Sequence, residues 1–347
     1  MQQLIQRLTD IGRTALLVIA PVMASSAFAQ TATWTDLSGR DDLHWIGISV
    51  PQPQVLWLAG TAGTIARSTD AGATWSYSQP GPAELEFRDI EAVDEQRAYA
   101  LSVGENGNSR IYYTANGGRS WILGYRAPST IFLNCIALSE RGELWGYADS
   151  LNGRWELIRS ADGRNWVTAS NVASAPPLFG EGGFAASGQC VRHHNGRWAI
   201  GTGNAAVARV LSKNDFGIRF QVQTTPMPAG AMRGITSVWP MAADRLLVAG
   251  GDLGNTQSEP ALYQWQNDNW QALPTPPFTG PIYSLSVSAT HVLVTGPSGA
   301  ASSPIDEWQW TLESDANLWT SACLGAGTHC FVAGRNGLIA RLDFARP

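Results

Sequence analysis

Lysine is almost absent from this sequence: Lys213 is the only one, and Asp, Glu, Lys and Arg together make up 15% of the 347 residues. Coiled coils need many charged, helix-forming residues and solvated disordered chains need high charge, so neither class fits this composition. The 23 basic and 28 acidic residues give a net charge of −5. We therefore expect no binding to nucleic acid or to another polyanion.

The first 29 residues have the pattern of a secretory signal peptide. Two arginines precede an apolar run over 15–24, and Ala27-Phe28-Ala29 places small residues before a cleavage point at Gln30. An uncleaved membrane anchor is the alternative, but the run is too short to cross a hydrocarbon core of about 30 Å comfortably. No later stretch reaches the ~18 apolar residues of a membrane-spanning helix. We predict a signal peptide over 1–29 and a mature protein that is soluble in the periplasm or secreted.

Cysteine is scarce as well, with four in the chain. Because an exported chain meets an oxidising compartment, we expect these cysteines to pair. Cys323 and Cys330 flank a turn-like Gly-Ala-Gly stretch, and Cys135 and Cys190 have similar places in successive repeats. Among the three possible connectivities we favour 323–330 and 135–190. Four reduced, buried thiols are the alternative.

A unit of about 45 residues recurs along the rest of the chain. Each copy has two apolar, strand-like runs, the second ending in Gly, then a third run and a polar turn before an aromatic residue. Short strands at this spacing, separated by turn residues, predict an all-β fold. The aromatic residues that mark seven copies are Trp34, Trp75, Trp121, Trp166, Phe220, Trp270 and Trp310.

The last copy stops one strand short, and the missing strand is found at the other end of the chain. Residues 32–36 match 73–77, where a fourth strand begins. Pairing of this N-terminal strand with the last copy closes a ring and removes a free sheet edge. We predict one seven-bladed β-propeller of four-stranded blades over 30–347. Six or eight blades are the alternatives, because the last three copies are less regular.

The turn before the aromatic residue follows the pattern Ser-x-Asp-x-Gly-x-x-Trp. Its Asp can accept backbone N–H bonds within the turn, its Gly supplies a positive φ, and its Trp buries a large ring on the blade. Asn116 replaces Asp in the second copy, which indicates hydrogen bonding rather than catalysis. The structural residues of the three clearest copies are Ser68, Asp70, Gly72, Trp75, Asn116, Gly118, Trp121, Asp162, Gly163 and Trp166.

These turns resemble Asp-box (BNR) repeats. With the preceding phrase 60–67, the first of them is similar to the photosystem II stability and assembly factor family. The resemblance covers nearly the whole mature chain and is dense over 31–215. It implies a seven-bladed propeller, in a lumenal or periplasmic space, that acts as a binding or assembly platform. Photosystem II itself is not implied, since nothing in the sequence indicates a photosynthetic host.

Motifs for catalysis are mostly missing. The nearest match to a sialidase arginine motif, Phe87-Arg88-Asp89-Ile90, lacks the proline and follows the first turn instead of preceding it. His193 and His194 are adjacent on a strand and would point to opposite faces, so we predict no metal site, no cofactor and no catalytic residue. A secreted glycan-active enzyme of the sialidase or xyloglucanase kind, or a non-catalytic carbohydrate-binding module, is the alternative, since any propeller places some acids around its mouth.

In such a propeller, the loops between second and third strands and between blades emerge on one face, and the box turns on the other. We expect the first face to bind a protein partner, for example part of a membrane or envelope complex. We expect three arginines near the starts of inner strands, close to the channel: Arg88, Arg126 and Arg233. Solvated polar loops are the alternative. The candidate binding residues are Arg88, Glu105, Arg126, Asp149, Glu181, Phe184, Arg233 and Asp252.

Overall fold

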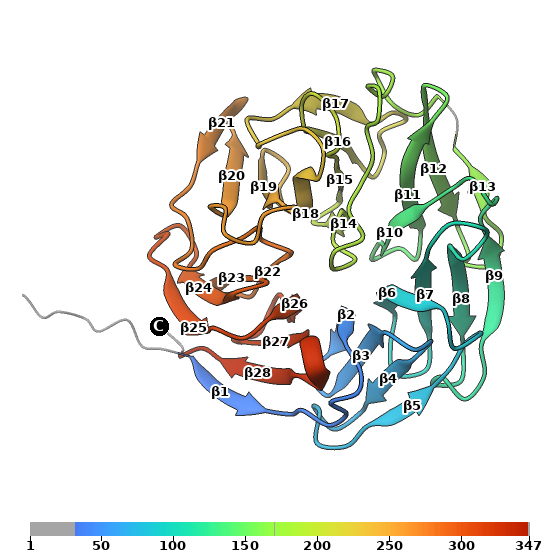
Figure 1. The fold of residues 1–347 in the computed structure, drawn as a ribbon, viewed down its shortest axis with the longest axis vertical. Coiled ribbons are helices and arrows are strands. Elements are labelled where there is room, and N and C mark those ends of the chain that lie inside the picture. The colour runs from blue at the N-terminus through green and yellow to red at the C-terminus, as the bar shows by residue number, and fades with distance from the viewer. Residues whose placement is uncertain (1–31, 170, 346–347) are drawn as a thin grey trace, which may run out of the picture.

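The computed structural model describes residues 32–169 and 171–345, which form seven four-stranded antiparallel sheets arranged in a ring (Figure 1). The predicted signal peptide lies outside the described residues. In the first six blades the strands run from the innermost to the outermost in chain order. Blade 1 contains β2 (Trp45–Gln52), β3 (Val55–Gly60), β4 (Ile65–Ser68) and β5 (Ser76–Ser78). Blade 2 contains β6 (Glu86–Ala92), β7 (Ala98–Val103), β8 (Arg110–Thr114) and β9 (Ile122–Arg126).

The next four blades repeat this order. Blade 3 contains β10 (Leu133–Leu138), β11 (Leu144–Leu151), β12 (Arg154–Ser160) and β13 (Val167–Thr168). Blade 4 contains β14 (Val191–His194), β15 (Arg197–Gly201), β16 (Arg209–Asn214) and β17 (Gln221–Thr224). Blade 5 contains β18 (Arg233–Ala242), β19 (Arg245–Asp252), β20 (Ala261–Gln266) and β21 (Asn269–Ala272). Blade 6 contains β22 (Ser284–Val287), β23 (His291–Gly296), β24 (Gly299–Pro304) and β25 (Thr311–Ser314).

Blade 7 closes the ring with strands from both ends of the chain. Its inner strands are β26 (Leu318–Cys323), β27 (His329–Gly334) and, after the short 3-10 turn η1 (Arg335–Gly337), β28 (Ile339–Asp343). The outer strand is β1 (Thr33–Asp36), which pairs antiparallel with β28 so that Trp34 lies opposite Leu342. The predicted seven blades and the predicted closure are confirmed, and the alternatives of six or eight blades are wrong.

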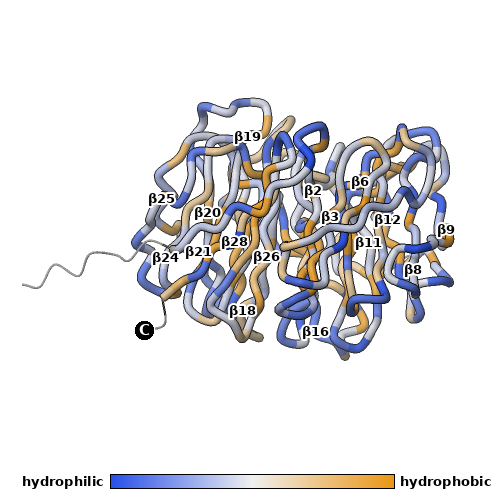
Figure 2. Tube along the Cα trace, turned by 90° about the horizontal axis from the view of Figure 1, so that it is seen from below, coloured by the Kyte–Doolittle hydropathy of each residue, from blue (hydrophilic) through white to orange (hydrophobic). Residues whose placement is uncertain are grey.

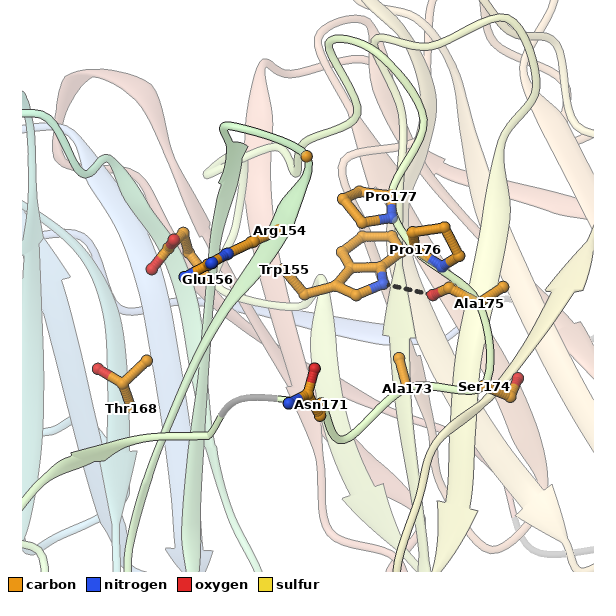
Figure 3. A pocket seen from close by; sticks show the side chains of 11 residues that line it. Arg154, Trp155, Glu156, Thr168, Asn171, Ala173, Ser174, Ala175, Pro176 and Pro177 are labelled. Carbon is orange, nitrogen blue, oxygen red and sulfur yellow. Dashed lines mark hydrogen bonds between the residues drawn. The ribbon is translucent and has the colours of Figure 1, made fainter.

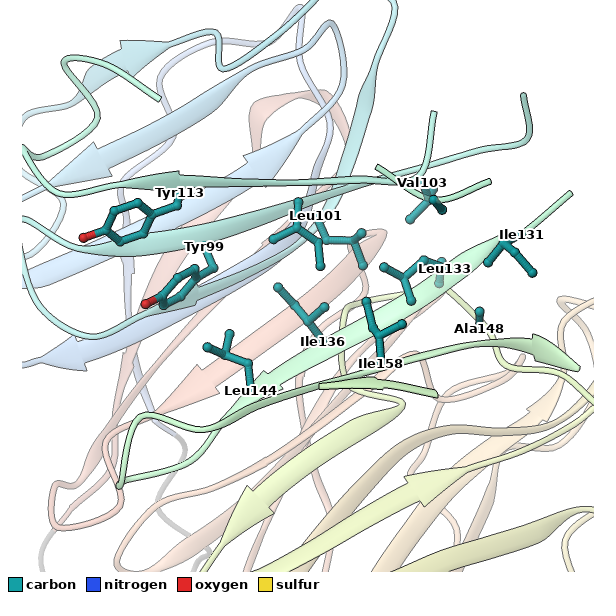
Figure 4. Close-up of a cluster of buried hydrophobic side chains, with 13 residues drawn as sticks. Tyr99, Leu101, Val103, Tyr113, Ile131, Leu133, Ile136, Leu144, Ala148 and Ile158 are labelled. Carbon is teal, nitrogen blue, oxygen red and sulfur yellow. The ribbon is translucent and has the colours of Figure 1, made fainter. Parts of the chain in front are cut away.

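The hydrophobic core lies between the blades. A blade is covered on both faces by its neighbours, so its second strand is a continuous apolar run; all six residues of β3 are buried. Figure 4 shows one such layer between blades 2 and 3, where Leu101 packs with Ile136 and Ile158. In the side view of Figure 2, apolar residues follow the strands while polar residues gather in the loops of the two faces.

The turns between third and fourth strands are held by side-chain bonds to the backbone. The Asp70 carboxylate accepts the Thr74 N–H at 2.8 Å, and the Asn116 amide oxygen accepts the Ser120 N–H at 3.0 Å in the equivalent place. Bonds from Thr74 and Ser68 lower the pKa of Asp70 to about 2. Asn116 carries no charge and still accepts the equivalent N–H bond, so hydrogen bonding by the side-chain oxygen is enough to hold the turn.

Two disulfides join the cysteines in the pairing that the sequence favours. Cys323 lies opposite Cys330 in the β26–β27 hairpin, with the two Cα atoms 4.1 Å apart. Cys135 on β10 is bonded to Cys190, which directly precedes β14, across a Cα separation of 5.9 Å. The second bond therefore ties blade 3 to blade 4. Over the described residues, no helix is long and apolar enough to span a membrane.

Candidate functional site at the channel mouth

A segment of blade 4, residues 185–190, enters the central channel before β14 begins; we call it the plug segment. In Figure 1 it is the yellow-green loop beside β14 that reaches toward the middle of the ring. Its Gln189 side chain donates to the Ser321 carbonyl at 2.7 Å. The same amide accepts from the Ser237 hydroxyl and the Leu285 N–H, each at 2.8 Å. One side chain therefore contacts the inner strands of blades 5, 6 and 7.

On its other side the plug segment lies against a buried acidic pair on β6. A Cβ at Gly188 would lie 2.4 Å from Asp89 Oδ1, so only glycine fits this approach. Asp89 accepts the Ile136 N–H at 2.7 Å, and Glu91 accepts a bond from Arg192 at 3.1 Å. Burial raises the pKa of both acids, that of Glu91 to about 7. Because both acids are buried and bonded to Ile136 and Arg192, we assign the pair a structural role beside the inner edge of β10.

A cavity of about 250 Å³ opens where the plug segment begins, at the mouth of the channel on the face opposite the box turns. Residues from blades 2, 3 and 5 and from the segment that leads into blade 4 surround it, because inner strands start and second strands end on this face. The lining residues are Arg88, Phe132, Asn134, Asp149, Gly183, Phe184, Ala185, Ala186, Met232 and Leu253.

Two charged side chains line this mouth cavity without being paired to each other. Arg88 donates from Nη1 to the Ala185 carbonyl at 3.1 Å and from Nη2 to Glu86 at 3.0 Å, and its buried Nε has no partner among the described residues. Asp149 accepts the Asn134 amide at 2.9 Å. Burial raises the pKa of Asp149, against the bonds that stabilise its ionised form. The cavity thus presents a fixed cation and a partly desolvated carboxylate.

Most of the remaining residues that line the mouth cavity are apolar, and one of them, Met232, has a strained backbone. Met232 has a φ of 58° and half of its surface is exposed. A left-handed conformation costs a residue with a side chain about 1–2 kcal/mol, and such strain collects at ligand clamps. The Met232 N–H donates to Asn204 at 3.0 Å, and the Met232 carbonyl accepts from Leu253 at 2.8 Å. These bonds hold Met232 in the lining of the cavity, to which Phe184 also belongs.

The candidate binding residues divide into three groups. Arg88, Asp149 and Phe184 line the cavity. Arg233 and Asp252 form an ion pair at 2.8 Å beside it, directly next to Met232 and Leu253 in the chain. The remaining three are Glu105, Arg126 and Glu181, and none of them lines the cavity.

Those three lie elsewhere for distinct reasons. Arg126 ends β9, the outermost strand of blade 2, so the expectation that it lies near the start of an inner strand is wrong. It donates to the Gly107 carbonyl at 3.2 Å in the same loop region as the exposed Glu105. Glu181 is fully buried and accepts bonds from Arg209 Nε at 3.0 Å and Thr202 at 2.7 Å, so its carboxylate cannot meet a partner.

The apolar wall formed by Phe132, Met232 and Leu253 was not predicted from the sequence. A signal for two of them was present, because Phe132 and Met232 directly precede inner strands and must therefore lie at the channel mouth. The adjacent histidines point apart, as His193 contacts Asp215 and His194 contacts Pro240. No cluster of three or more His, Cys, Asp or Glu able to hold a metal occurs in residues 32–169 and 171–345.

Comparison with known proteins rests on structure. No protein-family model and no curated protein matches the chain. The solved structure of YCF48 bound to a D1 peptide matches with a TM-score of 0.62 at 14% identity, over 90% of this chain and 97% of that one. The chain is similar to YCF48 in fold.

Two further solved structures agree with this. YCF48 from Cyanidioschyzon merolae matches with a TM-score of 0.62 at 15% identity, over 90% of this chain and 99% of that one. The WD40 domain of Neurospora crassa Pan2 matches with a TM-score of 0.64 at 12% identity, over 92% and 98%. At these identities the likeness to YCF48 and Pan2 concerns the fold, and it supports the predicted resemblance at that level. The Asp-box assignment stays a prediction.

Proposed function

We propose that this protein is an exported platform that binds a segment of a partner protein at the channel mouth, within a membrane or envelope complex. The observation that carries the proposal is the preformed mouth cavity, which Arg88 lines together with the apolar Phe184 and Met232. Mixed apolar and charged surfaces held in strained conformations suit recognition of a peptide side chain and its neighbours. That one structure of this fold, YCF48, is bound to a D1 peptide supports the same kind of use.

Export is supported by two features. The pattern of residues 1–29 is that of a signal peptide. Two disulfides form in the fold, and such bonds persist in oxidising compartments such as the periplasm. We therefore propose a periplasmic or secreted location.

The rival function, a glycan-active enzyme, is supported less well by the mouth cavity. Glycosidases place two carboxyl groups about 5–10 Å apart on either side of the scissile bond. Among the described residues, Asp149 is the one carboxylate that lines the cavity. The buried acidic pair, Asp89 and Glu91, accepts bonds from Ile136 and Arg192.

A photo-crosslinking experiment tests the proposal. A benzoylphenylalanine at Met232, which is half exposed, should crosslink to one discrete protein in the envelope fraction of the native host. Adding Arg88→Glu should abolish that product, because it reverses the charge inside the cavity. Adding Arg126→Glu, the same change on the outer rim, should leave it intact. Recovery of uncrosslinked protein alone, or equal crosslinking by both variants, would refute binding at the mouth.

A further inference from the structure

The outer edge of blade 3 is incomplete. Its outer strand β13 has two residues, whereas the outer strands of the other blades have three to five. The neighbouring strand β12 has seven residues but pairs with β13 only at Ile158 and Arg159. The first half of β12 therefore has no outer neighbour within the described strands.

The open part of this edge includes unpaired backbone groups. Beyond β13, the Ala169 N–H donates to the Leu157 carbonyl at 2.8 Å, which directs the backbone groups of Leu157 outward. Alternate residues of an antiparallel strand direct their groups to the same edge, so the N–H and C=O of Trp155 also face outward. Neither group bonds to another residue of the described chain on that side. Such an edge is a template for another strand.

A groove of about 480 Å³ lies along this open edge (Figure 3). Its far wall is the segment 173–177, which is already paired on its other side, where the Ser174 N–H donates to the Phe220 carbonyl at 2.8 Å. The Trp155 side chain is fixed between the two walls, because its Nε1 donates to the Ala175 carbonyl at 2.8 Å. The groove is thus preformed by paired elements on both sides.

We propose that this groove binds an extended segment of another protein as an added strand beside β12. The added strand would take the place that a longer β13 would occupy, and it would pair with the backbone of Trp155. Arg154 and Glu156, two residues apart, lie on one side of β12, so oppositely charged residues on the added strand would pair with them. On the other side, a small or apolar residue would pack against the Trp155 ring.

The occupant is assigned to a partner protein because the charges along the open edge alternate with an aromatic ring. Arg154 and Glu156 flank Trp155, so a strand of alternating apolar and charged residues complements this edge. Blades 3 and 4, which form the groove, lie across the ring from blade 7 (Figure 1). The groove also shares no residue with the mouth cavity. It is therefore a second binding surface, independent of the proposed mouth site.

Selection of linear peptides of about ten residues by mRNA display on the full-length wild-type protein tests this. Enriched peptides should alternate apolar and charged residues, and the bound peptide should slow hydrogen exchange at the Trp155 amide. The variant Ala175→Trp fills the groove and should weaken binding about tenfold. Its matched control is Ala243→Trp, another alanine whose carbonyl accepts a side-chain N–H, from Arg197 at 2.9 Å. That control should bind as the wild type does.

Three outcomes would overturn the proposal. One is that no enriched peptide slows hydrogen exchange at the Trp155 amide. This measurement uses the wild-type protein, so it does not depend on whether Ala175→Trp folds. Another is equal affinity of Ala175→Trp and Ala243→Trp. The third is loss of peptide binding in Arg88→Glu, since that would place the peptide in the mouth cavity. Unchanged affinity in Arg88→Glu supports a separate groove whether or not the mouth has a partner of its own.

Discussion

The Gln189 side chain of blade 4 donates a hydrogen bond to the Ser321 carbonyl of blade 7, a residue 132 positions later in the chain. The same buried amide accepts bonds from Ser237 and Leu285, so it connects inner strands that have no sheet pairing with one another. The plug segment therefore connects the blades across the ring, and its first residues, Ala185 and Ala186, also line the mouth cavity.

Replacing this amide by an isosteric apolar group should weaken the whole ring. Gln189→Leu removes the acceptor of the buried Ser237 hydroxyl and the donor to the buried Ser321 carbonyl, at roughly 1–3 kcal/mol for each unsatisfied group, while the Leu285 N–H keeps its bond to Ser237. The free energy of unfolding from urea titration should fall by at least one such increment. Gln96→Leu, a change at an exposed glutamine, should leave it unchanged. Equal stability of the two variants would contradict the bracing role.

The two disulfides should differ in what they contribute. Cys135–Cys190 spans 55 positions and Cys323–Cys330 spans 7. The chain-entropy relation then gives about 4 kcal/mol for the first bond and about 2 kcal/mol for the second. Calorimetry of the two double Cys→Ser variants should show the lower Tm for the variant without Cys135 and Cys190. The reverse order would show that chain entropy does not govern this ring.

We expect Met232 to lower the stability of the fold while it supports binding of the partner. Met232→Gly removes the cost of a left-handed backbone, so the Tm should stay the same or rise. The partner identified by crosslinking should no longer co-purify with this variant, because the apolar wall is lost. The control Leu312→Gly also removes an exposed side chain, but from an extended position in β25, and it should lower stability by about 0.5–1 kcal/mol. A destabilised Met232→Gly that still captures its partner would refute a clamp at this residue.

Stability should fall as pH rises from about 4.5 to neutrality because of the acids on β6. Burial raises the pKa of Glu91 from 4.5 to about 7, and raises the pKa of Asp89 as well. The folded state therefore binds more protons than the unfolded state over this interval, so the free energy of unfolding declines between about pH 4.5 and 7. Glu91→Gln should flatten this decline in urea titrations at several pH values.

A matched acid provides the control for the pH experiment. Glu105→Gln changes an exposed carboxyl in the loop after β7 and should keep the wild-type pH dependence. A wild-type protein whose stability rises steadily from pH 5 to 8 would show that the buried acids do not control this range.

The fold could be predicted because its repeats place similar residues at similar spacing. The match between the segments around Trp34 and Trp75 was enough to pair the first strand with the last. The plug segment could not be predicted in this way, since it belongs to no repeat and is held by contacts to residues about 50 to 130 positions away. Gln189 carries no local signal of its long-range partners.

Only part of the mouth cavity could be predicted from the order of the strands. Topology alone places Arg88, Asp149 and Phe184 at one face, and the structure brings them to one cavity. Topology could not show that Glu181 forms an ion pair with Arg209, because that contact depends on packing within blade 4. Nor could topology show the left-handed backbone of Met232, which hydrogen bonds to Asn204 and Leu253 hold in place.

The pairing of β1 with β28 has a consequence for the order of assembly. A ribosome makes the outer strand of blade 7 before any other strand described here, and makes the three strands that receive it last. That blade therefore cannot form while the polypeptide is still being synthesised. Until β28 emerges, β1 has an exposed edge without its pairing strand. A chaperone or translocation factor would need to shield β1 during that time.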